Sequence, residues 1–133
     1  MYRPKLLWAL LCDRYEIDPS THKVMIWGQF DTIVARSFPV LAPHSWLLTK
    51  WVVDPRSWVN LRFILKFPDT ADGDGHVIAT SASDGESGLF SAFYLHAQSL
   101  EGLLFSQPGD YTVEIYANDI LAHTLTFPVI PED

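Results

Sequence analysis

A regular alternation of side chains in the middle of the chain most constrains its fold. One set of positions is apolar and the set between them is mainly polar: Val59, Leu61, Phe63, Leu65 and Phe67 against Trp58, Asn60, Arg62, Ile64 and Lys66. A period of two residues places each set on its own face of a β-strand. No window of helix length has a convincing period of 3.6 residues, so the sequence predicts an all-β chain.

Short apolar runs separated by turn residues continue this pattern along the chain. Gly, Pro and Asp cluster at residues 18–21, 69–75 and 84–88, and Asn118-Asp119 predicts a tight hairpin. We expect an antiparallel β-sandwich of about eight strands, immunoglobulin-like or C2-like, in which residues 1–133 form one domain. Proline near the C-terminus predicts that the last strand frays at a sheet edge, the residues being Pro128 and Pro131.

Three motifs follow one another along the chain. They are Trp8-Ala9-Leu10-Leu11-Cys12-Asp13 in the first predicted strand, then Gly28-Gln29-Phe30-Asp31, then a hairpin with Phe105, Pro108, Gly109 and Tyr111. In this combination the chain resembles a widespread family of small bacterial proteins of unknown function. The resemblance implies a sandwich of this length and no known activity. It transfers no catalytic residue.

The charge balance and the length of the apolar runs exclude two classes of partner. The chain has 16 Asp and Glu against 9 Lys and Arg, a formal net charge of −7, and no basic cluster. Such a balance argues against binding to a nucleic-acid backbone. The longest apolar run, residues 6–12, is far shorter than the roughly 20 residues of a membrane-spanning helix. We expect neither a nucleic-acid nor a membrane partner.

Cys12, the one cysteine, follows basic and apolar residues, an order that also occurs in lipoprotein signals. The bulky Leu11 stands where such a signal has a small residue before its cysteine. We therefore favour a buried, reduced thiol in the first strand of a cytoplasmic protein.

Three aspartates in one turn-rich segment, Asp69, Asp72 and Asp74, form the candidate metal site. Carboxylates suit calcium, but an EF-hand fit fails because Val77 stands at the position of the required glycine. The next acidic turn lies roughly 26 Å away across an eight-residue strand, too far to share an ion. The alternative is that these aspartates are solvated turn residues. The five histidines are scattered, and we expect no cofactor.

Sequence motifs of enzymes are missing. There is no Gly-x-Ser-x-Gly nucleophile motif and no glycine-rich phosphate loop. Cys12 lies in an apolar run, where a thiol is not activated. We therefore expect a protein without catalytic activity.

All five tryptophans lie within the first 58 residues, more than one small core needs there. Trp46 and Trp51 face opposite sides of a regular strand, and Trp58 falls beside Arg62, within reach of a cation–π contact. We interpret Trp46, Trp51, Trp58 and Arg62 as a candidate surface for a protein partner, of which a second copy of the chain is the simplest. A carbohydrate-binding module and a metal-dependent sensor or enzyme are the alternatives.

Overall fold

The computed structural model describes residues 4–53, 59–68, 76–83 and 93–132, and every regular element in them is a β-strand. The all-β prediction is confirmed for these residues. The strands are β1 (Lys5–Ile17), β2 (Val24–Phe30), β3 (Ile33–Ala35), β4 (Val40–Leu41), β5 (Trp46–Val52), β6 (Val59–Lys66), β7 (His76–Ser83), β8 (Phe93–Ser99), β9 (Leu104–Phe105), β10 (Gly109–Ala117) and β11 (Ile120–Pro131).

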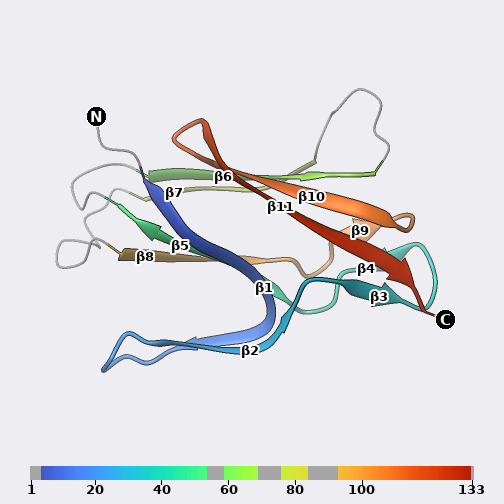
Figure 1. Ribbon diagram of the computed structural model, residues 1–133, viewed down its shortest axis with the longest axis horizontal. Helices are drawn as coiled ribbons and strands as arrows, with labels where there is room; N and C mark the ends of the chain where they lie inside the picture. The colour runs from blue at the N-terminus through green and yellow to red at the C-terminus, as the bar shows by residue number, and fades with distance from the viewer. Residues whose placement is uncertain (1–3, 54–58, 69–75, 84–92, 133) are drawn as a thin grey trace.

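The strands form two larger sheets and one small pair. The four-stranded sheet has the order β2-β1-β5-β8, the five-stranded sheet has the order β3-β11-β10-β6-β7, and β4 pairs with β9. Figure 1 shows the two larger sheets facing each other, with β6 and β10 above β5 and β8.

The main core lies between these two sheets. The alternation predicted in β6 is confirmed, because Val59, Leu61, Phe63 and Leu65 are each at most 2% exposed. Every second residue of β10 is buried as well, beginning at Tyr111, whose hydroxyl donates a 2.7 Å hydrogen bond to the carbonyl oxygen of Gln107. Burial of each large apolar side chain contributes about 1.5–3 kcal/mol before entropy is subtracted.

The predicted hairpin at Asn118-Asp119 joins β10 to β11. Ala117 and Ile120 are the last paired residues, so the loop has two residues. Both have positive φ, 50° at Asn118 and 67° at Asp119. Positive φ at both central residues is the signature of a type I′ turn, whose twist matches that of the two strands.

Three details of the predicted sandwich are wrong. The estimate of about eight strands missed β3, β4 and β9. Each of these strands has only two or three residues, too few to show an alternation of apolar and polar side chains in the sequence. The fold is not purely antiparallel, because β3 pairs parallel with the end of β11. That pairing also places β11 between β3 and β10 rather than at an edge. Pro128 is tolerated because it precedes the residues paired with β3, and Pro131 is the last residue of β11, opposite Ala35 at the end of that pairing.

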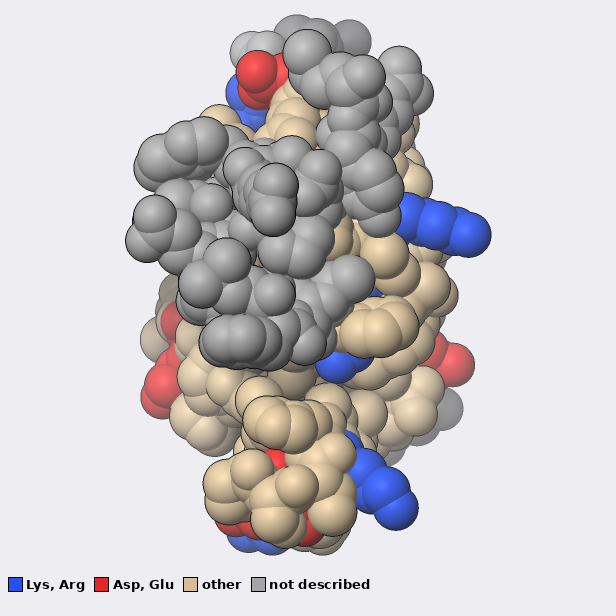
Figure 2. All heavy atoms as spheres, turned by 90° about the vertical axis from the view of Figure 1, so that its left-hand side faces the viewer, with Lys and Arg blue, Asp and Glu red and all other residues tan. Residues whose placement is uncertain are grey.

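A strong bend in β1 curls the four-stranded sheet (Figure 1). The first half of β1, up to Cys12, pairs with β5, and the second half, from Leu11 onward, pairs with β2. We call residues 13–30 the arm. The arm folds back beneath β5 and β8, and we call the side of the sheet that it faces the concave face. In Figure 2 the tip of the arm stands at the bottom, set off from the rest of the molecule.

Candidate functional site

The pairing register defines which side chains share the concave face, because directly paired residues point to the same side of a sheet. Leu11, Leu47 and Trp51 point the other way, into the main core. The concave face is made by Trp8, Leu10 and Cys12 of β1, Trp46, Leu48 and Lys50 of β5, and Leu95 and Ala97 of β8.

A second, smaller apolar cluster lies between this face and the arm. Cys12 and Leu48 have no exposed surface although they point away from the main core. The ring of Tyr15, on the arm, meets the ring of Trp46 edge-on with centroids 5.3 Å apart. Ile26 lies directly opposite Tyr15 on β2 and is half-buried. The arm therefore covers one part of the concave face, and side chains beyond it, such as Trp8 and Leu95, are half-buried.

Asp13 and Gly28 lie where β1 and β2 bend. Gly28 has a φ of 65°, which L side chains rarely adopt, and the Asp13 side chain occupies the space that a Cβ at Gly28 would need. The bend also interrupts the alternation of faces. Cys12 points to the concave side, and so does Tyr15 three residues later, whereas Arg14 points outward and lies 4.0 Å over the ring of Trp27.

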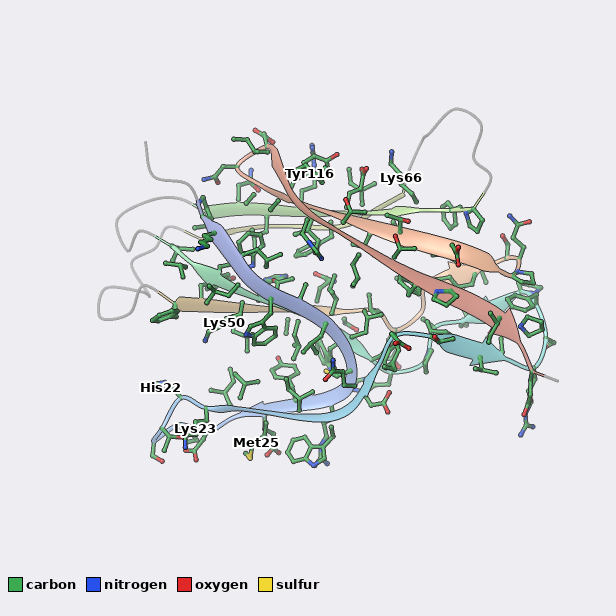
Figure 3. The ribbon with its side chains drawn as sticks, in the orientation of Figure 1. His22, Lys23, Met25, Lys50, Lys66 and Tyr116 are labelled. Atoms are coloured by element: carbon green, nitrogen blue, oxygen red, sulfur yellow. The ribbon has the colours of Figure 1, made fainter. Side chains whose placement is uncertain are left out.

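Lys50 places a positive charge in the middle of the concave face. Figure 3 shows its side chain reaching from β5 toward the arm. Its Nζ lies 5.9 Å from the centre of the Phe93 ring, and no carboxylate in the described part of the chain pairs with it. Lys5, opposite Val52, adds a second exposed cation at the end of this face. Apolar rings around an unpaired cation form a surface complementary to a carboxylate with apolar neighbours.

Trp46 is held at the border of this face by two ring contacts. Tyr15 lies on one side, and the ring of His44 meets it edge-on at 5.7 Å. His44 in turn pairs with Glu101 at 3.1 Å, with both side chains exposed. Trp46 itself is half-buried, so part of the indole is accessible to a partner.

The prediction that Trp51 belongs to an exposed surface is wrong. Its side chain is fully buried in the main core, and its Nε1 donates a 2.8 Å hydrogen bond to the Thr49 hydroxyl. The physical reason is register, since Trp51 shares its face with Leu47. Trp58 lies outside the described residues.

Arg62 lies in the other sheet, on β6, and does not join Trp46. Its guanidinium carbon sits 4.7 Å over the ring of Tyr116, opposite it on β10. Figure 3 shows Tyr116 and Lys66 on the far side of the molecule from the arm. Lys66 pairs with Glu114 at 3.6 Å, and the Tyr116 hydroxyl donates to Glu114, which raises the pKa of Tyr116. The three described residues of the predicted surface, Trp46, Trp51 and Arg62, are therefore not brought together.

The candidate metal ligands Asp69, Asp72 and Asp74 also lie outside the described residues. Elsewhere in the described ranges, no three His, Cys, Asp or Glu side chains are placed to hold a metal ion. Those ranges contain no helix of the length and apolarity needed to cross a membrane.

His96 is a titratable group that lies between the two sheets. Its ring stacks on Phe63 and its Nδ1 lies 3.4 Å from the Tyr94 hydroxyl, while Nε2 is buried with no hydrogen-bond partner in the described part of the chain. Burial lowers the pKa of His96, against a smaller opposing effect of a hydrogen bond with Gln98. The arrangement favours a neutral imidazole.

Cys12 is buried in the first strand, as the sequence predicted. Burial is the main cause that raises the pKa of its thiol, and the neighbouring charge of Asp13 adds to it. A raised pKa keeps the group a thiol rather than a nucleophilic thiolate.

Sequence reasoning missed the roles of Trp8, Tyr15 and Lys50. One signal was available: residues 6–12 are apolar on both faces, which is typical of a strand covered on both sides. The bend in β1 could not be predicted from the sequence, because Asp13 and Gly28 meet only through the pairing of β1 with β2.

Comparisons with known proteins give a family and no function. A search of curated proteins found no match. The model of a family of unknown function, DUF6941, matches residues 7–130, nearly the whole chain. The chain therefore belongs to the DUF6941 family.

Proposed function

We propose that the protein is a non-catalytic binding module that holds a protein partner on its concave face. The observation that carries the proposal is Lys50, which pairs with no carboxylate of the described residues and lies among partly exposed apolar and aromatic side chains. Phe93, beside Lys50, is 55% exposed, and Ile17 at the end of the arm is 48% exposed. Aromatic side chains and a charge of one sign are features of surfaces that bind protein.

The chemistry of this face also suggests which kind of segment it takes. Both charges that the register places on the face, Lys5 and Lys50, are positive, so the complementary group is a carboxylate. The rings of Trp8 and Trp46 offer apolar area on either side of Lys50. The proposed ligand is therefore a peptide segment with an acidic residue flanked by apolar ones.

Selection of a random displayed-peptide library against the purified protein tests this proposal. We expect the selected peptides to share an acidic residue between apolar residues, and Lys50→Gln to weaken their binding by about tenfold, or about 1.4 kcal/mol. The matched control is Lys66→Gln, which removes the same charge on the far side of the molecule and leaves binding unchanged.

The proposal fails if the selected peptides bind the Lys50→Gln variant and the wild type equally. It also fails if no peptide is selected and a glycan array gives specific hits instead, because the carbohydrate-binding alternative then explains the exposed rings.

The proposed location is the bacterial cytoplasm. The proposed fold is an immunoglobulin-like or C2-like sandwich. The cysteine content supports the location, because one buried cysteine without a disulfide is typical of a reducing compartment. Two facing sheets around an apolar core support the likeness to these sandwiches. Fractionation of the native host with an antibody to the protein tests the location, and recovery in the periplasmic or membrane fraction contradicts it.

A further inference from the structure

β8 forms an edge of the four-stranded sheet, and within the described residues it pairs with β5 alone. Its seven residues, Phe93–Ser99, include no Asp, Glu, Lys or Arg and no proline. Edge strands normally carry charged residues or proline, because an open uncharged edge pairs readily with another strand. An edge of this kind is suited to a partner strand.

The pairing of β5 with β8 defines which backbone groups point to this edge. The Leu100 N–H donates a 3.0 Å hydrogen bond to the Ser45 carbonyl oxygen, and these two residues continue the β5–β8 register by one step. In an antiparallel ladder, the backbone groups of successive residues point alternately toward and away from the neighbouring strand. Counted back from Leu100, the N–H and C=O groups of Leu95 and Ala97 therefore point away from β5, to the open edge.

The concave face continues onto any strand that pairs with this edge. The side chains of Leu95 and Ala97 lie on that face, opposite Lys50 and Leu48 of β5. Directly paired residues point to the same side of a sheet. A residue of a new strand that pairs with Leu95 therefore stands in one row with Leu95 and Lys50, with its side chain on the concave face.

Lys50 already extends from β5 toward this edge. Its Nζ lies 5.9 Å from the centre of the ring of Phe93, a residue of β8, and Figure 3 shows the Lys50 side chain on the side of the sheet that faces the arm. The backbone of a residue paired with Leu95 is two strand spacings, about 10 Å, from that of Lys50. The side chains of Lys50 and of a glutamate at that position project from the same face and together cross this distance. No carboxylate of the described residues competes for Lys50.

We propose that the ligand binds as an antiparallel β-strand added to β8, with an acidic residue paired with Leu95. This strand is the acidic peptide segment of the proposed function, on which the inference rests. The antiparallel direction is that of all strand pairs recorded for this sheet. The residues two positions before and after the acidic one then lie beside Ala97 and Phe93, with their side chains on the concave face. The ligand therefore has an apolar, an acidic and an apolar residue at alternate positions.

Backbone N-methylation of a defined peptide tests this geometry. The probe is an end-blocked peptide of the same length as β8, seven residues, with glutamate at its centre, valine two positions to either side and threonine elsewhere. The N–H of the glutamate points to the Leu95 carbonyl oxygen, whereas the N–H of the threonine after it points to solvent. In fluorescence titrations with the full chain, we expect N-methylation of the glutamate to weaken binding by about tenfold and N-methylation of the threonine by less than about threefold.

A second pair of changes tests the charge separately from the backbone. Glutamine in place of the central glutamate and Lys50→Gln in the protein should each weaken binding by about tenfold. Their combination should weaken it by about the same factor, because both remove one interaction. Lys66→Gln, on the far side of the molecule, is the control that leaves binding unchanged.

The proposal is overturned if both N-methylated peptides bind as tightly as the parent, or if the parent does not bind and library peptides of another pattern do. Binding that still depends on Lys50 in these cases supports the proposed function without strand addition. Binding that does not depend on Lys50 contradicts both proposals. A protein that dimerises in sedimentation and loses peptide binding as it does so assigns the β8 edge to a second copy of the chain, which also overturns the proposal.

Discussion

The imidazole of His96 lies nearly parallel to the ring of Phe63, with centroids 5.2 Å apart and planes at 14°. His96 belongs to β8 and Phe63 to β6, so this stack joins the four-stranded sheet to the five-stranded sheet through the core. A titratable ring thus contributes to the contact between sheets, and its protonation state is coupled to the stability of the fold.

The stability of the protein should fall as the pH drops below about 6.5, the pKa of histidine in an unfolded chain. Burial lowers the pKa of His96 in the folded state, so the unfolded state binds more protons in this range. The contribution of neutral His96 to stability is complete above its pKa in the unfolded state. It is lost as the pH falls through its lower pKa in the folded state. The slope stays below about 1.4 kcal/mol per pH unit, since one histidine exchanges at most one proton.

Urea unfolding of wild type and His96→Phe between about pH 5.5 and about pH 7.5, one unit on either side of the histidine pKa, measures this pH dependence. The variant keeps a ring on Phe63 and removes the titration. We expect a flatter pH profile for the variant. If stability depends on pH equally in both proteins, the loss at low pH comes from carboxylates instead. Asp18 is one such group, because hydrogen bonds from Ser20 lower its pKa.

Truncation of Leu48 should lower the free energy of unfolding as much as truncation of a leucine in the main core. Leu48 is fully buried in the second cluster, so Leu48→Ala leaves a cavity and lowers the free energy of unfolding by about 2–5 kcal/mol. Leu47→Ala, on the opposite face of the same strand, is the matched comparison. A loss for Leu48→Ala of less than about 1 kcal/mol would mean that the arm does not cover this face in solution.

Substitution of Gly28 should destabilise the arm. Gly28→Ala forces a side chain into a positive-φ position, at a cost of roughly 1–2 kcal/mol, and against the side chain of Asp13. Adding Asp13→Ala removes the steric part of this cost and recovers some stability. Thermal unfolding of both single variants and the double variant separates the two causes, and simple additivity would contradict the contact.

A glycine at the second hairpin position should stabilise the protein. Asp119 has a φ of 67° in the type I′ turn, a conformation that glycine adopts without strain. We expect Asp119→Gly to raise the free energy of unfolding by about 0.5–1 kcal/mol and Asp119→Val to lower it. The same unfolding midpoint for all three proteins would show that this turn is not strained.

The strands with clear alternation were predictable because each lies with one face toward the core. The burial of Phe63 and Val113 is predicted by the apolar residues two positions before and after each of them. The candidate site was predictable only in part. Trp46 is half-buried at the border of the concave face, whereas Trp51 on the same strand is fully buried, since the pattern gives two faces without saying which is inside. The bend at Asp13 and Gly28, and the parallel pairing of β3, depend on contacts between residues distant in sequence.

Consecutive residues of β1, Leu11 and Cys12, are 2% and 0% exposed on opposite faces of one strand. Leu11 belongs to the main core and Cys12 to the second cluster. The strand cannot leave one apolar layer without disrupting the other, so the backbone amides around Leu11 are the ones that solvent reaches last. We therefore expect the arm and the body of the protein to unfold as a single cooperative unit.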